Sequence, residues 1–268
     1  MTNLAILGAG KMGETLLSGL LRSGTPASDV VVSTRRDERA KALEEKYGVS
    51  AVATADAAER GETLLIAVKP QDMGDLLEQI NPVVRADQLV ISMAAGIPTA
   101  FIERRLADDV PVVRVMTNTP ALVDEAMSAI SAGSHALEAH LLRAEDLFRH
   151  VGKVLRVPEY QQDAVTALSG SGPAYFFFLV EAMIDAGILL GLPRTVAADL
   201  LVQTAIGSAV MLRDSGEHPV QLREAVTSPA GTTISAIREL ENHGVRAAFL
   251  AAIEAARDRS RELAGGHD

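Results

Sequence analysis

The sequence opens with LAILGAGKMG at residues 4–13, an apolar run that ends at three closely spaced glycines. This pattern predicts a buried strand that turns sharply into a helix, whose free backbone N–H groups can bind a phosphate. Gly8 permits the bend, and Gly10 lets a pyrophosphate approach the backbone closely. Because an ordinary glycine-rich turn is the alternative, the stretch by itself indicates a dinucleotide site and nothing more specific.

Apolar runs alternate with helical periodicity through the first part of the chain. After the opening strand, further strands are predicted at 30–33, 64–68, 89–93, 112–116, 128–131 and, as an edge, 153–157. Helices are predicted between them at 15–22, 37–47, 73–80, 99–106 and 135–150. Such alternation is typical of an α/β fold, with a mostly parallel sheet covered on both faces. We expect a Rossmann-type dinucleotide-binding domain over residues 1–158.

From Glu159 onward the strand-like runs disappear and alanine-rich helical periodicity continues to the end. We expect a second, helical domain over residues 159–268, with helices at 173–190, 195–215, 234–241 and 245–263. The first of these helices is apolar nearly all round, and Phe176, Phe177 and Phe178 point in different directions from it. A helix of this kind must be covered on every side, which predicts a homodimer. A monomer with a central helix is the alternative.

Composition limits the classes of partner. The chain has 268 residues, 48% of them hydrophobic and 22% charged, with a net charge of −10. These values are typical of a soluble globular protein, and they argue against nucleic acid or an acidic membrane as a partner, because both need a basic surface. Glu181 and Asp185 interrupt the most membrane-like segment, 173–192, so we expect a buried helix there. No signal peptide is expected, because no basic and apolar leader precedes the first strand. No disulfide is expected, since the chain lacks cysteine, and the predicted location is cytoplasmic.

The end of the second predicted strand reads Ser33, Thr34, Arg35, Arg36, with no acidic residue before Asp37. An acid at this place binds the ribose 2′-hydroxyl of NAD, whereas basic residues accommodate the 2′-phosphate of NADP. Two hydroxyls and two guanidinium groups suit a dianionic phosphate. We therefore expect NADPH, with NADH as a second choice. A solvated arginine pair at the start of a helix is the alternative interpretation.

Residue types restrict the chemistry of the helical half. The last lysine of the chain is Lys153, so the helical half contains none. Its histidines are not paired at metal-ligand spacing, so no metal site is expected. Ser169 does not lie in the G-x-S-x-G arrangement of a hydrolase. Two loops at predicted helix starts, 168–175 and 227–233, are rich in Gly, Ser and Thr. Both could be simple helix caps, but Ser228, Thr232 and Thr233 beside free N–H groups also suit a carboxylate.

Several longer motifs point to one family. They are GAGKMG (8–13), AVKP (67–70), MAAG (93–96), VRVMTNTP (113–120), DAVTALSGSGPAY (163–175), GLPR (191–194) and QLREAVTSPAGTT (221–233). With these motifs the sequence resembles the pyrroline-5-carboxylate reductases nearly end to end. The resemblance implies a helical C-terminal domain like that of 6-phosphogluconate dehydrogenase, intertwined in a homodimer that assembles further in some members. It also implies reduction of 1-pyrroline-5-carboxylate to L-proline by NAD(P)H, the last step of proline biosynthesis.

The resemblance also assigns site residues. It places the dinucleotide against four segments, whose residues are Gly8, Ala9, Gly10, Lys11, Met12, Ser33, Thr34, Arg35, Ala67, Val68, Lys69, Pro70, Ala94, Ala95 and Gly96. It places the substrate carboxylate against Ser228, Ala230, Gly231, Thr232 and Thr233. Thr233 meets the substrate nitrogen and is the expected catalytic residue. The family usually has S-P-G-G where this chain has Ala230, a change that is tolerable at negative φ and strained at positive φ.

Three rival functions stay open at this point. A β-hydroxyacid dehydrogenase, or another imine reductase, resembles the same architecture. The dehydrogenase needs a titratable lysine one turn into the helix, where this chain has Tyr175 and Phe176. A non-catalytic nucleotide-binding sensor would keep the glycine turn but would not need the residues from Ser228 to Thr233.

Overall fold

The computed structural model describes residues 4–265 and forms two compact units. The first unit contains the chain up to Ser171 together with the residues from Ala256 onward. The second unit contains Gly172–Ala255. A single helix, α12 (Val245–Gly265), therefore contributes residues to both units. The domain boundary that the sequence indicates, between residues 158 and 159, stays a prediction.

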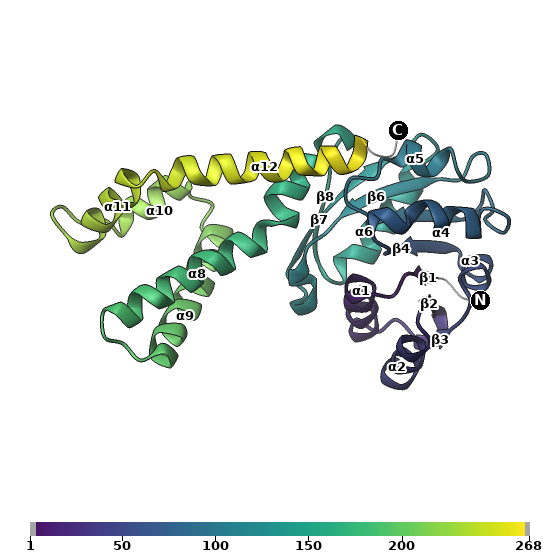
Figure 1. Ribbon diagram of the computed structural model, residues 1–268, viewed down its shortest axis with the longest axis horizontal. Coiled ribbons are helices and arrows are strands. Elements are labelled where there is room, and N and C mark those ends of the chain that lie inside the picture. The colour runs from purple at the N-terminus through teal and green to yellow at the C-terminus, as the bar shows by residue number, and fades with distance from the viewer. Residues whose placement is uncertain (1–3, 266–268) are drawn as a thin grey trace. The chain divides into compact units, whose positions relative to one another are not determined.

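An eight-stranded sheet lies at the centre of the first unit (Figure 1). Its strands are β1 (Leu4–Leu7), β2 (Val30–Ser33), β3 (Ser50–Ala51), β4 (Thr63–Ile66), β5 (Leu89–Ser92), β6 (Val112–Met116), β7 (Ala126–Ala132) and β8 (Gly152–Arg156). The spatial order is β3-β2-β1-β4-β5-β6-β7-β8, and neighbouring strands are parallel except for the antiparallel pair β6–β7. Strand order reverses between β1 and β4, and in such sheets ligands bind at the carboxyl ends of the strands at this point.

Helices cover both faces of the sheet, as the sequence predicts. One buried cluster joins the strands to α1 (Lys11–Arg22), α2 (Asp37–Tyr47) and α6 (Glu138–Arg149). A second cluster joins the other face to α3 (Thr54–Arg60), α4 (Met73–Ile80) and α5 (Thr99–Glu103). The strands β1, β2, β4 and β5 are buried over their whole length. Strands covered on both faces need continuous apolar runs, which explains why these runs are visible in the sequence.

A network of ion pairs around the buried Arg114 fixes the last part of the first unit. Arg114 of β6, which is 5% exposed, lies 3.5 Å from Glu159 and 3.8 Å from Asp163 of α7 (Gln162–Val165). The Glu159 carboxylate accepts hydrogen bonds from the backbone and the hydroxyl of Thr99, both at 2.7 Å. Ser260 of α12 donates a hydrogen bond of 2.7 Å to Asp163. These contacts hold the end of α12 against the sheet domain.

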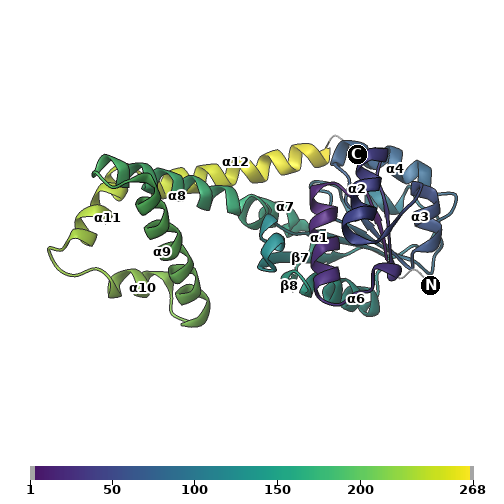
Figure 2. The ribbon, with the colours of Figure 1, turned by 90° about the horizontal axis from the view of Figure 1, so that it is seen from below.

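The second unit consists of helices. They are α8 (Gly172–Leu189), α9 (Arg194–Asp214), α10 (Pro219–Ala225), α11 (Thr232–Asn242) and the first part of α12. A π-helical turn at Thr166–Gly170 leads into α8. The helices α8 and α9 pack side by side (Figure 2). Close approach requires Gly187, because a Cβ at this position would lie 2.9 Å from the Cβ of Ala197.

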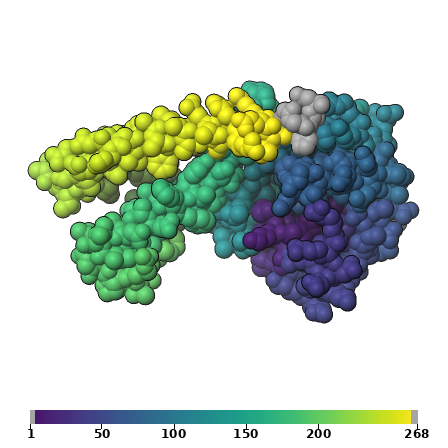
Figure 3. All heavy atoms as spheres, viewed as in Figure 1, coloured from purple at the N-terminus to yellow at the C-terminus, as the bar shows by residue number. Residues whose placement is uncertain are grey.

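Burial in the second unit is very limited. Its buried residues are Gly172, Gly187 and Ala197. Phe176, Phe177 and Phe178 are 69%, 68% and 72% exposed. On the face that Figure 3 shows, α8 lies open at the surface. In the single chain this helix lacks the cover that the sequence analysis expects from a second subunit, because no element of the unit reaches its outer sides. By length and composition alone, the helical run Glu159–Leu189 and α9 are both apolar enough to span a membrane.

Candidate functional site

The turn between β1 and α1 has the geometry that its glycines predict. The backbone N–H groups of Gly8 and Ala9 donate to the Ser33 carbonyl at 3.0 and 2.9 Å, which ties the turn to the end of β2. Gly8 has a φ of +89°, and a Cβ there would collide with Val68. Gly10 is the N-cap residue of α1 and brings no side chain, so the first N–H groups of the helix are accessible to an anion.

An ion cluster braces this turn from the side of α2. Glu14, in the first turn of α1, accepts hydrogen bonds from Arg39, from Lys46 at 3.0 Å and from Tyr47 at 2.9 Å. Arg39 also donates to the carbonyl of Ala9 at 3.3 Å, within the glycine turn itself. The hydrogen bond from Arg39 is the main cause that lowers the pKa of Glu14 to about 2. Glu14 is therefore ionised at neutral pH, and the cluster fixes the orientation of the turn.

A cavity of about 490 Å³ opens at the carboxyl ends of β1, β2 and β4. The glycine turn contributes Gly8 and Gly10 to its lining. The rest of the lining consists of Ser33, Thr34, Arg35, Arg36, Thr54, Ala67, Val68, Lys69, Asp72, Asp75, Leu76 and Gln79. Three cations and two carboxylates thus surround it. The cavity lies at the point where strand order reverses, which is where a dinucleotide binds in this type of sheet.

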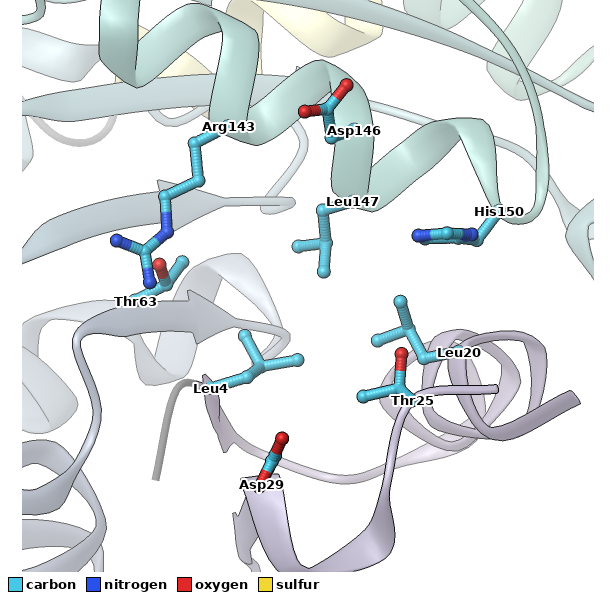
Figure 4. A pocket seen from close by; sticks show the side chains of 9 residues that line it. All are labelled: Leu4, Leu20, Thr25, Asp29, Thr63, Arg143, Asp146, Leu147 and His150. Carbon is cyan, nitrogen blue, oxygen red and sulfur yellow. The ribbon is translucent and has the colours of Figure 1, made fainter. Parts of the chain in front are cut away.

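A smaller cavity of about 180 Å³ lies at the opposite ends of the strands, beside the first residues of β1 and β4. Leu4 of β1 and Leu147 of α6 point into it from opposite sides (Figure 4). Polar side chains at its border include Asp29, Arg143 and His150. Because ligands of such sheets bind at the carboxyl ends of the strands, we assign the dinucleotide to the larger cavity.

The second candidate site is the loop between α10 and α11. The Gly231 N–H donates to the Ser228 carbonyl at 3.2 Å, and Pro229 and Ala230 occupy the two central positions of this turn. Ala230 has a φ of +57°. Proline followed by a residue with positive φ is the pattern of a type II turn, in which glycine is usual at the position of Ala230. The question that the sequence leaves open is thus answered: the alanine sits in a strained, left-handed conformation.

Helix α11 begins directly after this turn. Its N-cap is Gly231, which has extended backbone angles and offers no capping side chain. Thr232 and Thr233 form the first two residues of the helix. The unpaired N–H groups of a helix start, flanked by the hydroxyls of Ser228, Thr232 and Thr233, can bind a carboxylate. The loop belongs to the second unit, whereas the large cavity belongs to the first.

The predicted cofactor residues fall into four segments that all follow the ends of strands in the first unit. Those that line the large cavity are Gly8, Gly10, Ser33, Thr34, Arg35, Ala67, Val68 and Lys69. Ala9, Lys11, Met12 and Pro70 are their chain neighbours, while Ala94, Ala95 and Gly96 follow β5. Sequence reasoning does not find Thr54, Asp72, Asp75, Leu76 and Gln79 in the lining. The last four of these residues come soon after the AVKP motif (67–70) in the sequence, and only this proximity could have indicated them.

The parallel sheet, the glycine turn and the charged cavity at the reversal of strand order define a dinucleotide-dependent oxidoreductase. Residues 159–263 match the family described as pyrroline-5-carboxylate reductase dimerisation, and residues 3–96 match NADP oxidoreductase coenzyme F420-dependent. A pyrroline-5-carboxylate reductase of Corynebacterium melassecola is 43% identical, over 98% of this chain and 99% of its own. The chain belongs to the pyrroline-5-carboxylate reductase family.

Solved structures agree with this assignment. A pyrroline-5-carboxylate reductase from Coxiella burnetii superimposes with a TM-score of 0.90 at 34% identity, covering 98% of both chains. A pyrroline carboxylate reductase of Plasmodium falciparum, solved with NADP bound, also gives a TM-score of 0.90, at 27% identity and 98% coverage of both chains. The predicted fold, a Rossmann-type domain followed by a helical dimerisation domain, is thereby confirmed.

Proposed function

We propose that this enzyme reduces the cyclic imine 1-pyrroline-5-carboxylate to L-proline with hydride from NADPH, as the last step of proline biosynthesis. The observation that carries the proposal is membership of the reductase family over 98% of the chain, combined with a dinucleotide cavity that has the expected glycine turn. NADH is the alternative hydride donor.

The large cavity fits NADPH in its charges and in its backbone geometry. The accessible N–H groups after Gly10 would hold the pyrophosphate, and the collision with Val68 explains why position 8 carries no side chain. Arg35, with Ser33 and Thr34 before it, would hold the 2′-phosphate at the end of β2. The remaining predicted contacts, at 67–70 and 94–96, follow β4 and β5 and would border the nicotinamide half. NADP bound in the structure of the Plasmodium falciparum relative supports this choice.

The loop from Ser228 to Thr233 would hold the substrate. N–H groups at the start of α11 and the hydroxyls of Ser228 and Thr232 would bind its carboxylate. Thr233 would hydrogen-bond the ring nitrogen. Ala230 and Gly231 shape the turn, and the left-handed conformation of Ala230 keeps the loop in the form that a glycine would adopt.

The chemistry asks little of acid-base residues. The nicotinamide supplies the hydride, and the acceptor is the carbon of a protonated C=N bond, which is already electrophilic. Hydride addition therefore discharges a cation and requires no oxyanion hole. The protein contributes by fixing the carboxylate and the ring nitrogen, so that the imine carbon is held in one orientation. This role explains why hydroxyl and backbone donors suffice in a loop without lysine or histidine.

The functional unit would be a homodimer formed through the helical domain, residues 159–268 in our division of the chain. The exposed apolar sides of α8 and α9 support this, because a soluble protein does not leave such surface uncovered. The match of residues 159–263 to a dimerisation family supports it as well. We further propose that the helices of the two copies intertwine, that dimers assemble into a larger oligomer, and that the enzyme is soluble and cytoplasmic.

An NADPH absorbance assay with a panel of substrates tests the activity. We expect turnover with 1-pyrroline-5-carboxylate and formation of L-proline. Turnover with β-hydroxyacids and NADP⁺ in place of the imine would instead indicate a dehydrogenase. Binding of NADPH without turnover of any substrate would indicate a nucleotide sensor.

The cofactor assignment has its own test in Arg35→Ala. Loss of a charge-assisted contact with the phosphate should weaken NADPH binding by about 10- to 150-fold, because such hydrogen bonds contribute about 1.5–3 kcal/mol. NADH binding should change little, since its ribose carries no phosphate. An equal loss for both cofactors in a binding titration would remove Arg35 from the 2′-phosphate site.

A further inference from the structure

Arg35 already has a partner in the structure, and that partner is a carboxylate. We propose that Asp72 is a cofactor-selecting residue, which the 2′-phosphate of NADPH must displace from Arg35. The proposal rests on the function proposed above, in which Arg35 binds that phosphate. It adds a residue that lies outside every motif on which the family resemblance depends.

The contact between the two side chains is bidentate. Arg35 donates from Nη1 to Oδ1 and from Nη2 to Oδ2 of Asp72, each at 3.0 Å. Both terminal nitrogens of the guanidinium are thus engaged by the carboxylate. A phosphate bound in the same fork needs the same donors, so the two anions compete for one cation.

The position of the pair connects it to the cofactor. Arg35 follows β2, whereas Asp72 ends the short 3₁₀ helix at Pro70–Asp72 that follows β4. Both residues line the large cavity, and their ion pair joins the two loops that border it. The Arg35 side chain is 81% exposed and that of Asp72 is 23% exposed, so the pair lies at the solvent-facing rim.

Charge explains why the pair distinguishes the two cofactors. The cations that line the cavity are Arg35, Arg36 and Lys69, and the carboxylates are Asp72 and Asp75. A cofactor without a 2′-phosphate offers Arg35 nothing in place of Asp72 and leaves the pair closed. A cofactor with this dianionic group offers more acceptor oxygens and more charge, so it can replace the carboxylate. Asp72 therefore weakens binding of the phosphorylated cofactor selectively and sets how strongly NADPH is preferred.

The test compares two cofactor fragments, adenosine 2′,5′-bisphosphate and AMP, by calorimetric titration of the full-length enzyme. For Asp72→Asn we expect the bisphosphate to bind about three- to tenfold more tightly, within the range that a partly exposed ion pair contributes. AMP should bind as it does to the wild type. Asparagine is also a good helix N-cap, so the start of α4 at Asp72 is preserved.

A double-mutant cycle isolates the contact itself. The double variant Arg35→Ala, Asp72→Asn should bind the bisphosphate as Arg35→Ala alone does, because residue 72 then has no arginine to pair with. Asp75→Asn is the matched control, since it removes the same charge from the same cavity and leaves the Arg35–Asp72 pair intact. This control should strengthen bisphosphate binding by a smaller factor than Asp72→Asn does, because Arg35 stays paired. In steady-state assays, Asp72→Asn should lower the KM for NADPH relative to that for NADH.

Two outcomes would overturn the proposal, and they differ from failure of the cofactor assignment. Weaker bisphosphate binding by Asp72→Asn would mean that Asp72 supports Arg35 and does not compete with the phosphate. An equal shift for both fragments would reduce Asp72 to a general charge effect. By contrast, Arg35→Ala with unchanged bisphosphate affinity would show that the phosphate binds elsewhere, and the assignment of Arg35 would fail first.

Discussion

The two units of this chain differ in how completely they bury their apolar side chains. In the first unit, the strands β1, β2, β4 and β5 are wholly buried, and helices cover both faces of the sheet. In the second unit, helix α8 carries three phenylalanines that are each more than two-thirds exposed. The first unit therefore has its own core. The second unit needs a second copy of the chain to cover its apolar helices. In the function proposed above, the first unit binds the cofactor and the second unit binds the substrate.

The largest expected effect comes from breaking the second unit. For Phe177→Asp we expect dissociation of the dimer and a loss of kcat/KM of about 100-fold or more, because an unpaired charge would be buried in an apolar interface. Light scattering and the NADPH assay measure the two effects. Leu137→Asp is the matched control, since Leu137 is 68% exposed but lies at the start of α6 in the first unit. A dimeric, fully active Phe177→Asp enzyme would contradict the comparison.

A smaller effect is expected from the cluster that braces the glycine turn. The pKa of Glu14 is lowered to about 2, so its contribution to stability is present above its unfolded pKa and is lost as the pH falls from about 4.5 towards 2. The full shift corresponds to about 3 kcal/mol, which solvent screening reduces to about 1–2 kcal/mol. Glu14→Gln should lower the unfolding free energy by this amount at pH 7 and by little at pH 2.

Denaturant unfolding at several pH values measures this effect. Glu45→Gln, which changes an exposed glutamate of α2 outside the cluster, is the control. If the two variants lose equal stability at pH 7, the cluster around Glu14 does not brace the turn.

The smallest effect concerns the strained turn in the second unit. Ala230→Gly should raise the unfolding free energy by about 1 kcal/mol, because it removes the penalty of a left-handed alanine and outweighs the added freedom of the unfolded chain. Thermal unfolding at fixed protein concentration is the measurement. Ala107→Gly, in an exposed loop with ordinary φ, should instead lower stability. A loss of stability in both variants would mean that the turn is not strained.

Much of the fold could be predicted because the strands and helices of the first unit show as local patterns of apolar residues in the sequence. Strands buried on both faces need unbroken apolar runs, and helices such as α2 and α4 begin and end where predicted. The prediction misses β3, which has only the two residues Ser50–Ala51, and the short α3 after it. Neither is long enough to show periodicity. It also misses α10 and the π-helical turn at Thr166–Gly170, where hydrogen bonding and not composition distinguishes the element.

The candidate site also has features that the sequence predicts and features that it does not. The glycine turn could be predicted, because sharp bends and close backbone approach demand glycine, and the structure gives Gly8 the expected positive φ. Asp72 could not be predicted, since its pairing with Arg35 joins residues 37 positions apart in the sequence. The conformation of Ala230 also could not be settled from its identity. The residue type favours negative φ, and only the backbone of the structure, with a φ of +57° at Ala230, shows that the opposite is present.

We propose that substrate and cofactor are held by different units, and the kcat/KM of Thr233→Val for 1-pyrroline-5-carboxylate tests this most directly. We expect a fall of about 5- to 150-fold, equivalent to one lost hydrogen bond of about 1–3 kcal/mol, with NADPH affinity unchanged. Unchanged kcat/KM would remove Thr233 from the substrate site. A matching loss of NADPH affinity would contradict the division of the site between the two units.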